Sequence, residues 1–134
     1  MEEENKIKEK SFEFSLMIIE VYKKMILQKE FIISKQIFRS ATSIGANVAE
    51  SQGGISKREF RNKMSIALKE ALETRYWLEL LTTSKLVDLK LDKEYDSLEN
   101  IINLLYKIIK TTTENLLNEN RNFSLNNAPI LGID

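Results

Sequence analysis

The sequence predicts an all-α protein, an antiparallel four-helix bundle with up-down-up-down topology. Two observations carry this prediction. The chain has only one proline and four glycines among 134 residues, too few to bound the many short strands of an all-β fold. Its apolar residues recur three or four positions apart, which is the spacing of one face of a helix. Short connections between long helices favour antiparallel neighbours.

Stripes of apolar residues place the helices in order along the chain. The first helix is predicted from about Ile7 to Lys29, and the second from about Ser34 to the pair Gly53-Gly54. The fourth is predicted from about Asp92 to about Asn118. Residues 1–118 are therefore expected to form one bundle domain, and the Asn-rich residues 119–134 a flexible C-terminal tail.

The third helix has the best-defined start, because two capping signals coincide there. Ser56 and Glu59 have the spacing of a capping box, in which the serine side chain accepts from the amide three residues later. Ile55 and Phe60 flank that box as a hydrophobic staple. The helix is then expected to run to about Ser84.

Two absent residue types restrict the chemistry. The chain has no His and no Cys, so it lacks the commonest general base, the thiolate nucleophile and the usual zinc ligands. We therefore expect no enzymatic activity, no metal site and no cofactor. The start Met1-Glu2-Glu3-Glu4 is acidic, unlike a secretory signal, and no apolar run approaches the roughly 20 residues of a spanning helix. A cytoplasmic protein without a membrane partner is expected.

The second predicted helix has a polar face of an unusual kind. Solvated faces are usually filled with Lys and Glu, whereas this one is rich in small hydrogen-bonding residues that are poorer helix formers. Such residues suit a close subunit contact, although a plain exposed face or a ligand groove would also accommodate them. The predicted oligomer interface consists of Gln36, Arg39, Ser40, Ser43, Asn47 and Glu50.

The start of the third helix carries the densest cluster of positive charge. The net charge of the chain is zero, but cations at a helix N-terminus oppose the helix macrodipole and so suggest an anionic partner. The alternative is an ordinary solvated turn. The candidate nucleic-acid-binding residues are Lys57, Arg58, Arg61 and Lys63.

Arg75 falls by helical angle beside Met64, Leu68 and Ala71, near the centre of the apolar stripe of the third helix. A buried guanidinium must reach solvent or meet a carboxylate. The candidate partners in this region are Glu50, Glu70 and Glu73. A structural ion pair is expected here rather than a catalytic one.

The motif Gln36-x-x-Arg39-Ser40-Ala41-x-Ser43-Ile44-x-Ala46-Asn47-Val48-Ala49-Glu50 resembles the signature of a bacterial four-helix-bundle family. The family includes proteins encoded in intervening sequences of 23S ribosomal RNA genes, and the accessory proteins of diversity-generating retroelements are related. The downstream run Ala67-x-x-Glu70-Ala71-x-Glu73-Thr74-x-Tyr76-Trp77 fits the same pattern, so the resemblance covers roughly residues 10–117. One departure is Ser51, where the family usually has Gly.

The resemblance implies a cytoplasmic homo-oligomer, often a ring-like pentamer, with nucleic acid or a reverse transcriptase as partner in the retroelement branch. The first functional hypothesis is therefore an oligomeric adaptor that binds RNA or DNA through repeated copies of the basic cluster. The alternative is a protein-protein interaction bundle without nucleic-acid binding. Salt-dependent RNA binding separates the two.

Overall fold

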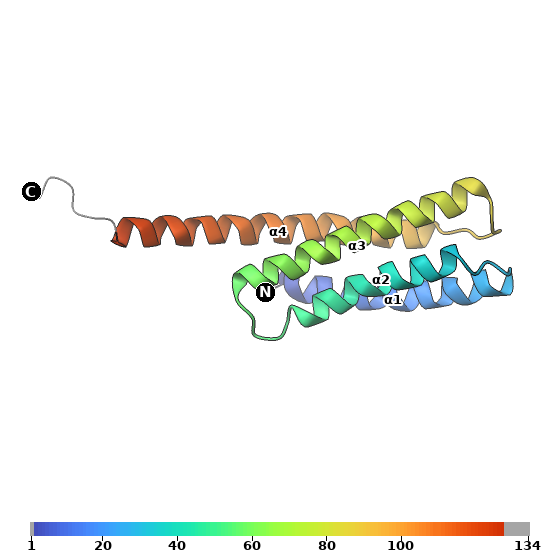
Figure 1. Cartoon of the computed structure of the whole chain (residues 1–134), viewed down its shortest axis with the longest axis horizontal. Helices are drawn as coiled ribbons and strands as arrows, with labels where there is room; N and C mark the ends of the chain where they lie inside the picture. Colours follow the sequence, from blue (N-terminus) through green and yellow to red (C-terminus); the bar gives the residue numbers. More distant parts are fainter. Residues whose placement is uncertain (1, 128–134) are drawn as a thin grey trace, which may run out of the picture.

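The computed structural model describes residues 2–127, which form four consecutive helices (Figure 1). They are α1 (Glu2–Leu27), α2 (Ile33–Glu50), α3 (Lys57–Ser84) and α4 (Asp92–Asn127). Helix α1 packs against α2 and α4, and α3 packs against the same two, while the diagonal pairs make no contact among the described residues. This arrangement confirms the predicted all-α four-helix bundle.

The core is continuous along the bundle because each helix turns one apolar stripe inward. The largest side chains with no exposed surface are Ile7, Phe14, Ile18, Met25, Ile37, Ile44, Met64, Leu78, Leu81, Leu98, Ile101 and Leu105. No helix of residues 2–127 has both the length and the apolar character that crossing a membrane would require.

Helix α2 begins with a cap that the sequence did not reveal. Glu30, in the α1–α2 turn, is 7% exposed, and its carboxylate accepts from the backbone amides of Ile32, Ile33 and Ser34 at 3.1, 2.9 and 2.5 Å. Burial alone would raise the pKa of Glu30, but these three amides outweigh burial and hold its pKa below the ordinary value. Lys29 precedes it with a φ of 63°, and this left-handed residue ends α1.

Helix α3 begins as predicted. Ser56 is its N-cap, and the Ser56 side chain accepts from the backbone amide of Glu59 at 3.2 Å. At the opposite end of the bundle, the side chain of Gln28 exchanges two hydrogen bonds with the backbone of Asp88, at 3.0 and 2.8 Å. The α1–α2 turn and the α3–α4 loop are therefore joined to each other.

Three helix boundaries differ from those predicted. Helix α1 starts at Glu2 rather than near Ile7, since its three leading glutamates complement the positive end of the helix macrodipole. Helix α2 ends at Glu50, before the glycine pair. Helix α4 runs to Asn127, so residues 119–127 of the predicted tail are helical. Residues 128–134 of that tail lie outside the described residues.

Candidate interaction surfaces of α2 and α3

Ser40, predicted to face another subunit, lies inside the bundle instead. It has no exposed surface, and its Oγ is 2.8 Å from Oγ1 of Thr74, which is also fully buried. The Thr74 hydroxyl lies equally close to the backbone oxygen of Glu70. The prediction that Ser40 contacts a second copy is therefore wrong, because α3 of the same chain covers it. Its small polar side chain serves to pair α2 with α3.

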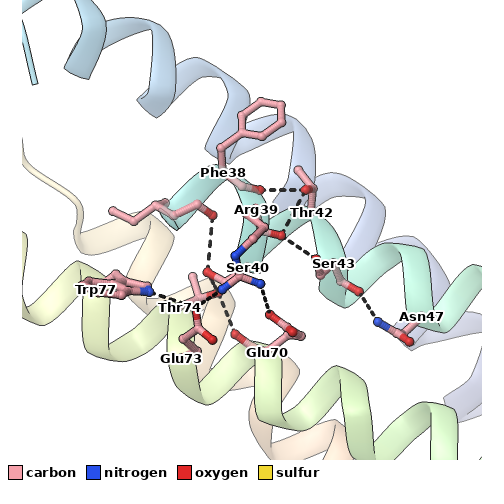
Figure 2. A network of polar contacts seen from close by, with 11 residues as sticks. Phe38, Arg39, Ser40, Thr42, Ser43, Asn47, Glu70, Glu73, Thr74 and Trp77 are labelled. Atoms are coloured by element: carbon pink, nitrogen blue, oxygen red, sulfur yellow. Dashed lines mark hydrogen bonds and ion pairs between the residues drawn. The ribbon is translucent and has the colours of Figure 1, made fainter. Parts of the chain in front are cut away.

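Arg39 sits at the rim of this buried pair and joins the two helices by ion pairs (Figure 2). Its guanidinium contacts the carboxylate of Glu70 at 3.2 Å and also that of Glu73. The indole of Trp77 donates to the same Glu73 carboxylate at 3.0 Å. Half of the Arg39 side chain remains exposed. The cluster is thus a fixed, partly exposed patch that combines an arginine with an aromatic ring.

The remaining predicted interface residues stay at the surface but are partly engaged within the chain. Gln36, Ser43 and Asn47 are half-buried. The Ser43 hydroxyl donates to the backbone oxygen of Arg39 at 2.6 Å, and the Asn47 amide donates to that of Ser43 at 2.8 Å. Glu50 pairs with a lysine of α3. Their role in a subunit contact stays a prediction.

The four cations at the start of α3 point to different sides of that helix. Lys57 pairs with Glu119 of α4, and the Nε of Arg61 donates to Oγ1 of Thr113 at 2.6 Å, also on α4. Lys63 points the other way and contacts Glu50 of α2 at 2.7 Å.

Arg58 is exposed and makes no side-chain hydrogen bond or ion pair within residues 2–127. The structure therefore brings Lys57, Arg58 and Arg61 together on the solvent and α4 sides of α3. Lys63 lies apart from them.

Arg75 has a different partner from those predicted. Its guanidinium contacts Glu99 of α4 at 3.0 Å, and neither Glu50, Glu70 nor Glu73 reaches it. The hydrogen bond to Glu99 raises the pKa of Arg75. The side chain is about one third exposed. The pair is a structural link between α3 and α4, on the side of α3 away from Arg39.

A groove between α1 and α2 was not predicted from the sequence. It encloses about 700 Å³, is lined mainly by small side chains and has the exposed ring of Phe12 at its edge. Gly45 makes the two helices approach closely here, because a Cβ at that position would lie 3.2 Å from Ser15 Oγ and 3.3 Å from the backbone oxygen of Ser11. The sequence feature that could have indicated this close approach is Gly45 itself, a glycine in the middle of an amphipathic helix.

The residues described contain no group of three or more Asp, Glu, His or Cys side chains placed to hold a metal ion. The contacts of Arg39 with Glu70 and Glu73, and those of Lys57 and Arg61 with α4, are ion pairs and hydrogen bonds. Such surfaces can bind a partner by charge, by hydrogen bonds and by aromatic contact.

The model of the 23S rRNA-intervening sequence protein family matches residues 3–111 of this chain. The chain belongs to this family. A similar solved structure is the crystal structure of a protein of unknown function from the S23 ribosomal protein family of Bacteroides thetaiotaomicron VPI-5482. It is 45% identical, covers 81% of this chain and 98% of its own, and superposes with a TM-score of 0.77. No match was found among curated proteins.

Membership in the 23S rRNA-intervening sequence protein family confirms the resemblance carried by the α2 motif. The matched residues include all the α2 and α3 residues described above: the contact cluster of Arg39, Ser40, Glu70, Glu73, Thr74 and Trp77, and the basic cluster at the start of α3. They end at Thr111, whereas α4 continues to Asn127. The last 16 residues of α4 are thus outside the matched part of the chain.

Proposed function

We propose that this protein is a non-enzymatic, homo-oligomeric adaptor of the cytoplasm that binds nucleic acid, with RNA the first candidate, through the start of α3. The observation that carries the proposal is the grouping of Lys57, Arg58 and Arg61 on one exposed region of the first two turns. The free amides and the macrodipole of this helix end add positive potential to the same region.

The intramolecular partners of these cations do not preclude nucleic-acid binding. Side chains of Lys57 and Glu119 are each about half exposed, and exposed ion pairs contribute only about 0–1 kcal/mol. A phosphate with three acceptor oxygens can replace such a partner, with release of counterions. Arg58 has no intramolecular partner within residues 2–127 that a phosphate would have to replace.

RNA is preferred over DNA because of what the comparisons name. The matching family is described by an intervening sequence of 23S rRNA, and the similar crystal structure is assigned to a ribosomal protein family. Both descriptions refer to ribosomal RNA or the ribosome. Structured RNA offers phosphates and unpaired bases, which basic and aromatic side chains recognise.

Oligomerisation would make a small basic region effective. One copy of three cations binds phosphate weakly, while several copies held in one ring act together and raise the overall affinity. The exposed part of the Arg39, Glu73 and Trp77 cluster supports self-association, because arginine and tryptophan are enriched at the centres of protein interfaces. Ser43 lies beside it on α2.

Size-exclusion chromatography with light scattering tests both parts of the proposal. We expect a mass above that of the 15.6 kDa chain, and a further rise when structured RNA is added at low salt, which high salt reverses. Ser43→Lys is expected to lower the mass without loss of helicity, while Asn103→Lys on exposed α4 surface is the matched control. An oligomer that binds neither RNA nor DNA at low salt would favour the protein-protein interaction bundle instead.

A further inference from the structure

The C-terminal part of α4 leaves the bundle and carries exposed apolar side chains. Lys57, the first residue of α3, pairs with Glu119 of α4. Helix α3 therefore begins beside this part of α4 and does not accompany it further. Figure 1 shows α4 continuing straight past the α2–α3 loop with no other helix beside it. Residues 117–127, here called the α4 extension, are all exposed. The ten helical steps from Leu117 to Asn127 span about 15 Å.

The apolar residues of this region lie on two sides of the helix. Leu117 and Leu125, 58% and 71% exposed, are eight positions apart and share one side. Phe123, 68% exposed, lies roughly opposite them, where it continues the buried stripe of α4. A flat surface would cover only one of these sides, whereas a groove between two helices can cover both.

The sequence of the α4 extension also indicates a partner. It contains five asparagines, which are poor helix formers, and a solvent-exposed helical end of this length is only marginally stable by itself. Burial of its apolar side chains against another surface would stabilise the helix. The matched part of the family ends at Thr111, before this segment, so the segment lies outside the part of the chain that the family model matches.

The groove between α1 and α2 fits the α4 extension in length and in lining. Its α1 wall runs from Asn5 to Ser15, a rise of about 15 Å that matches the α4 extension. The lining is mainly apolar, and the small side chains of Ala46 and Ala49 leave room for a helix. The exposed ring of Phe12 offers an apolar contact at its edge.

Each surface carries charges of both signs: Lys8 and Glu9 line the groove, and Glu119 and Arg121 lie on the α4 extension, where Glu119 already pairs with Lys57. Arg121 lies between Leu117 and Leu125 on the same side of the α4 extension, and Glu9 lies in the wall of the groove. Neither forms an ion pair within residues 2–127. The hydroxyls of Ser15 and Thr42 in the groove can receive the amides of the asparagines.

Within the described residues, the α4 extension does not reach the groove of its own chain. Helix α4 packs against α1 and α3 but makes no contact with α2 among the described residues, and the α4 extension runs away from the end of the bundle. We infer that the α4 extension of one copy docks into the α1/α2 groove of a second copy. This inference goes beyond the proposed nucleic-acid binding and does not depend on it.

Disulfide cross-linking tests the contact directly, since the chain has no cysteine. The Ala46→Cys variant carries a cysteine in the groove, and the Leu125→Cys variant carries one in the α4 extension. The two variants are mixed and oxidised at a concentration where self-association is observed. We expect a cross-linked heterodimer as the main product. In the matched control, the Ala46→Cys variant is mixed with a Leu27→Cys variant instead. Leu27 is 83% exposed and lies at the other end of the bundle. An equal yield from the control pair, or no heterodimer, overturns the inference.

A second experiment measures the strength of self-association. The double variant Leu117→Ser and Leu125→Ser is expected to weaken self-association by at least about tenfold in sedimentation equilibrium, because two apolar side chains lose a buried site. The double variant Leu27→Ser and Leu86→Ser, which alters two leucines 83% and 56% exposed in the single copy, should leave it unchanged. Unaltered self-association in the first variant contradicts the docking. RNA binding measured on the same variants reports on the proposed function separately.

Discussion

At the scale of single residues, the bundle shows two ways of starting a helix. Ser56 caps α3 through its hydroxyl, next to a recognisable capping box. Glu30 caps α2 through a buried carboxylate that accepts three backbone amides. The first cap was predictable because its spacing is a known signature. The second was not, because the left-handed turn at Lys29 brings Glu30 back over the helix start.

We predict that Ser56→Ala destabilises the fold by about 1 kcal/mol, since it removes the acceptor for the backbone amide of Glu59. Urea unfolding followed by circular dichroism measures the change. Ser65→Ala, in the middle of the same helix, removes the same hydroxyl without removing a cap. It is expected to be neutral or slightly stabilising. Equal midpoints for Ser56→Ala and the wild type would mean that the cap contributes nothing.

Glu30 makes the stability depend on pH in a defined direction. Its pKa is lower in the folded protein than in the unfolded chain, so its contribution is present above the ordinary value of 4.5 and is lost as pH falls through the folded pKa. Glu30→Gln removes the charge and is expected to cost about 2 kcal/mol at pH 7.

Urea unfolding of wild type and Glu30→Gln at pH 7 and at pH 3 checks this prediction. The difference in unfolding free energy between the two proteins should shrink at pH 3, where the wild-type carboxyl is increasingly protonated. A difference that is the same at both pH values would exclude the carboxylate as the source of the stability.

At the scale of the helices, small polar residues join α2 to α3. The motif that resembles the family signature supplies Ser40, which meets Thr74 inside the bundle, and Arg39, which meets Glu70 and Glu73 at its rim (Figure 2). A hydroxyl pair buried between two helices fixes their distance and register, because each group lacks access to water. The motif therefore has a structural role in addition to any role at a subunit contact.

We predict that Thr74→Val destabilises the protein by about 1–2 kcal/mol, because it leaves the buried hydroxyl of Ser40 without its side-chain partner at nearly unchanged volume. The double variant Ser40→Ala with Thr74→Val should recover part of that loss. A double-mutant cycle from urea unfolding measures the coupling. Strict additivity of the two substitutions would mean that the hydroxyls do not stabilise each other.

The helices could be predicted from the sequence more completely than the contacts between them. The periodic stripes predicted all four helices, and the capping box located the start of α3. Contacts such as Arg75 with Glu99 depend on the register between α3 and α4, which no local pattern specifies. The end of α4 was missed for a different reason, since its last residues are polar and rich in Asn, a composition typical of a frayed tail.

At the scale of the whole molecule, the proposed nucleic-acid-binding residues and the α4 extension gather at one end of the bundle. The start of α3, the end of α2 and the projecting end of α4 meet there, as the ion pairs Lys57–Glu119 and Lys63–Glu50 show. The net charge of the chain is zero, so any affinity for nucleic acid must come from this local arrangement and not from overall charge. Charge reversal at this end is therefore a specific test.

The central claim is that the start of α3 binds nucleic acid. Fluorescence anisotropy with structured RNA at a series of salt concentrations, for the wild type and for Lys57→Glu, Arg58→Glu and Arg61→Glu combined, tests it most directly. The wild-type affinity should fall by about 0.7–0.9 log units per log unit of salt for each phosphate contacted. The triple variant should lose binding while keeping its helicity, because these side chains lie outside the core. Wild-type protein without affinity at low salt, or a folded triple variant with the same salt dependence as the wild type, would contradict the claim.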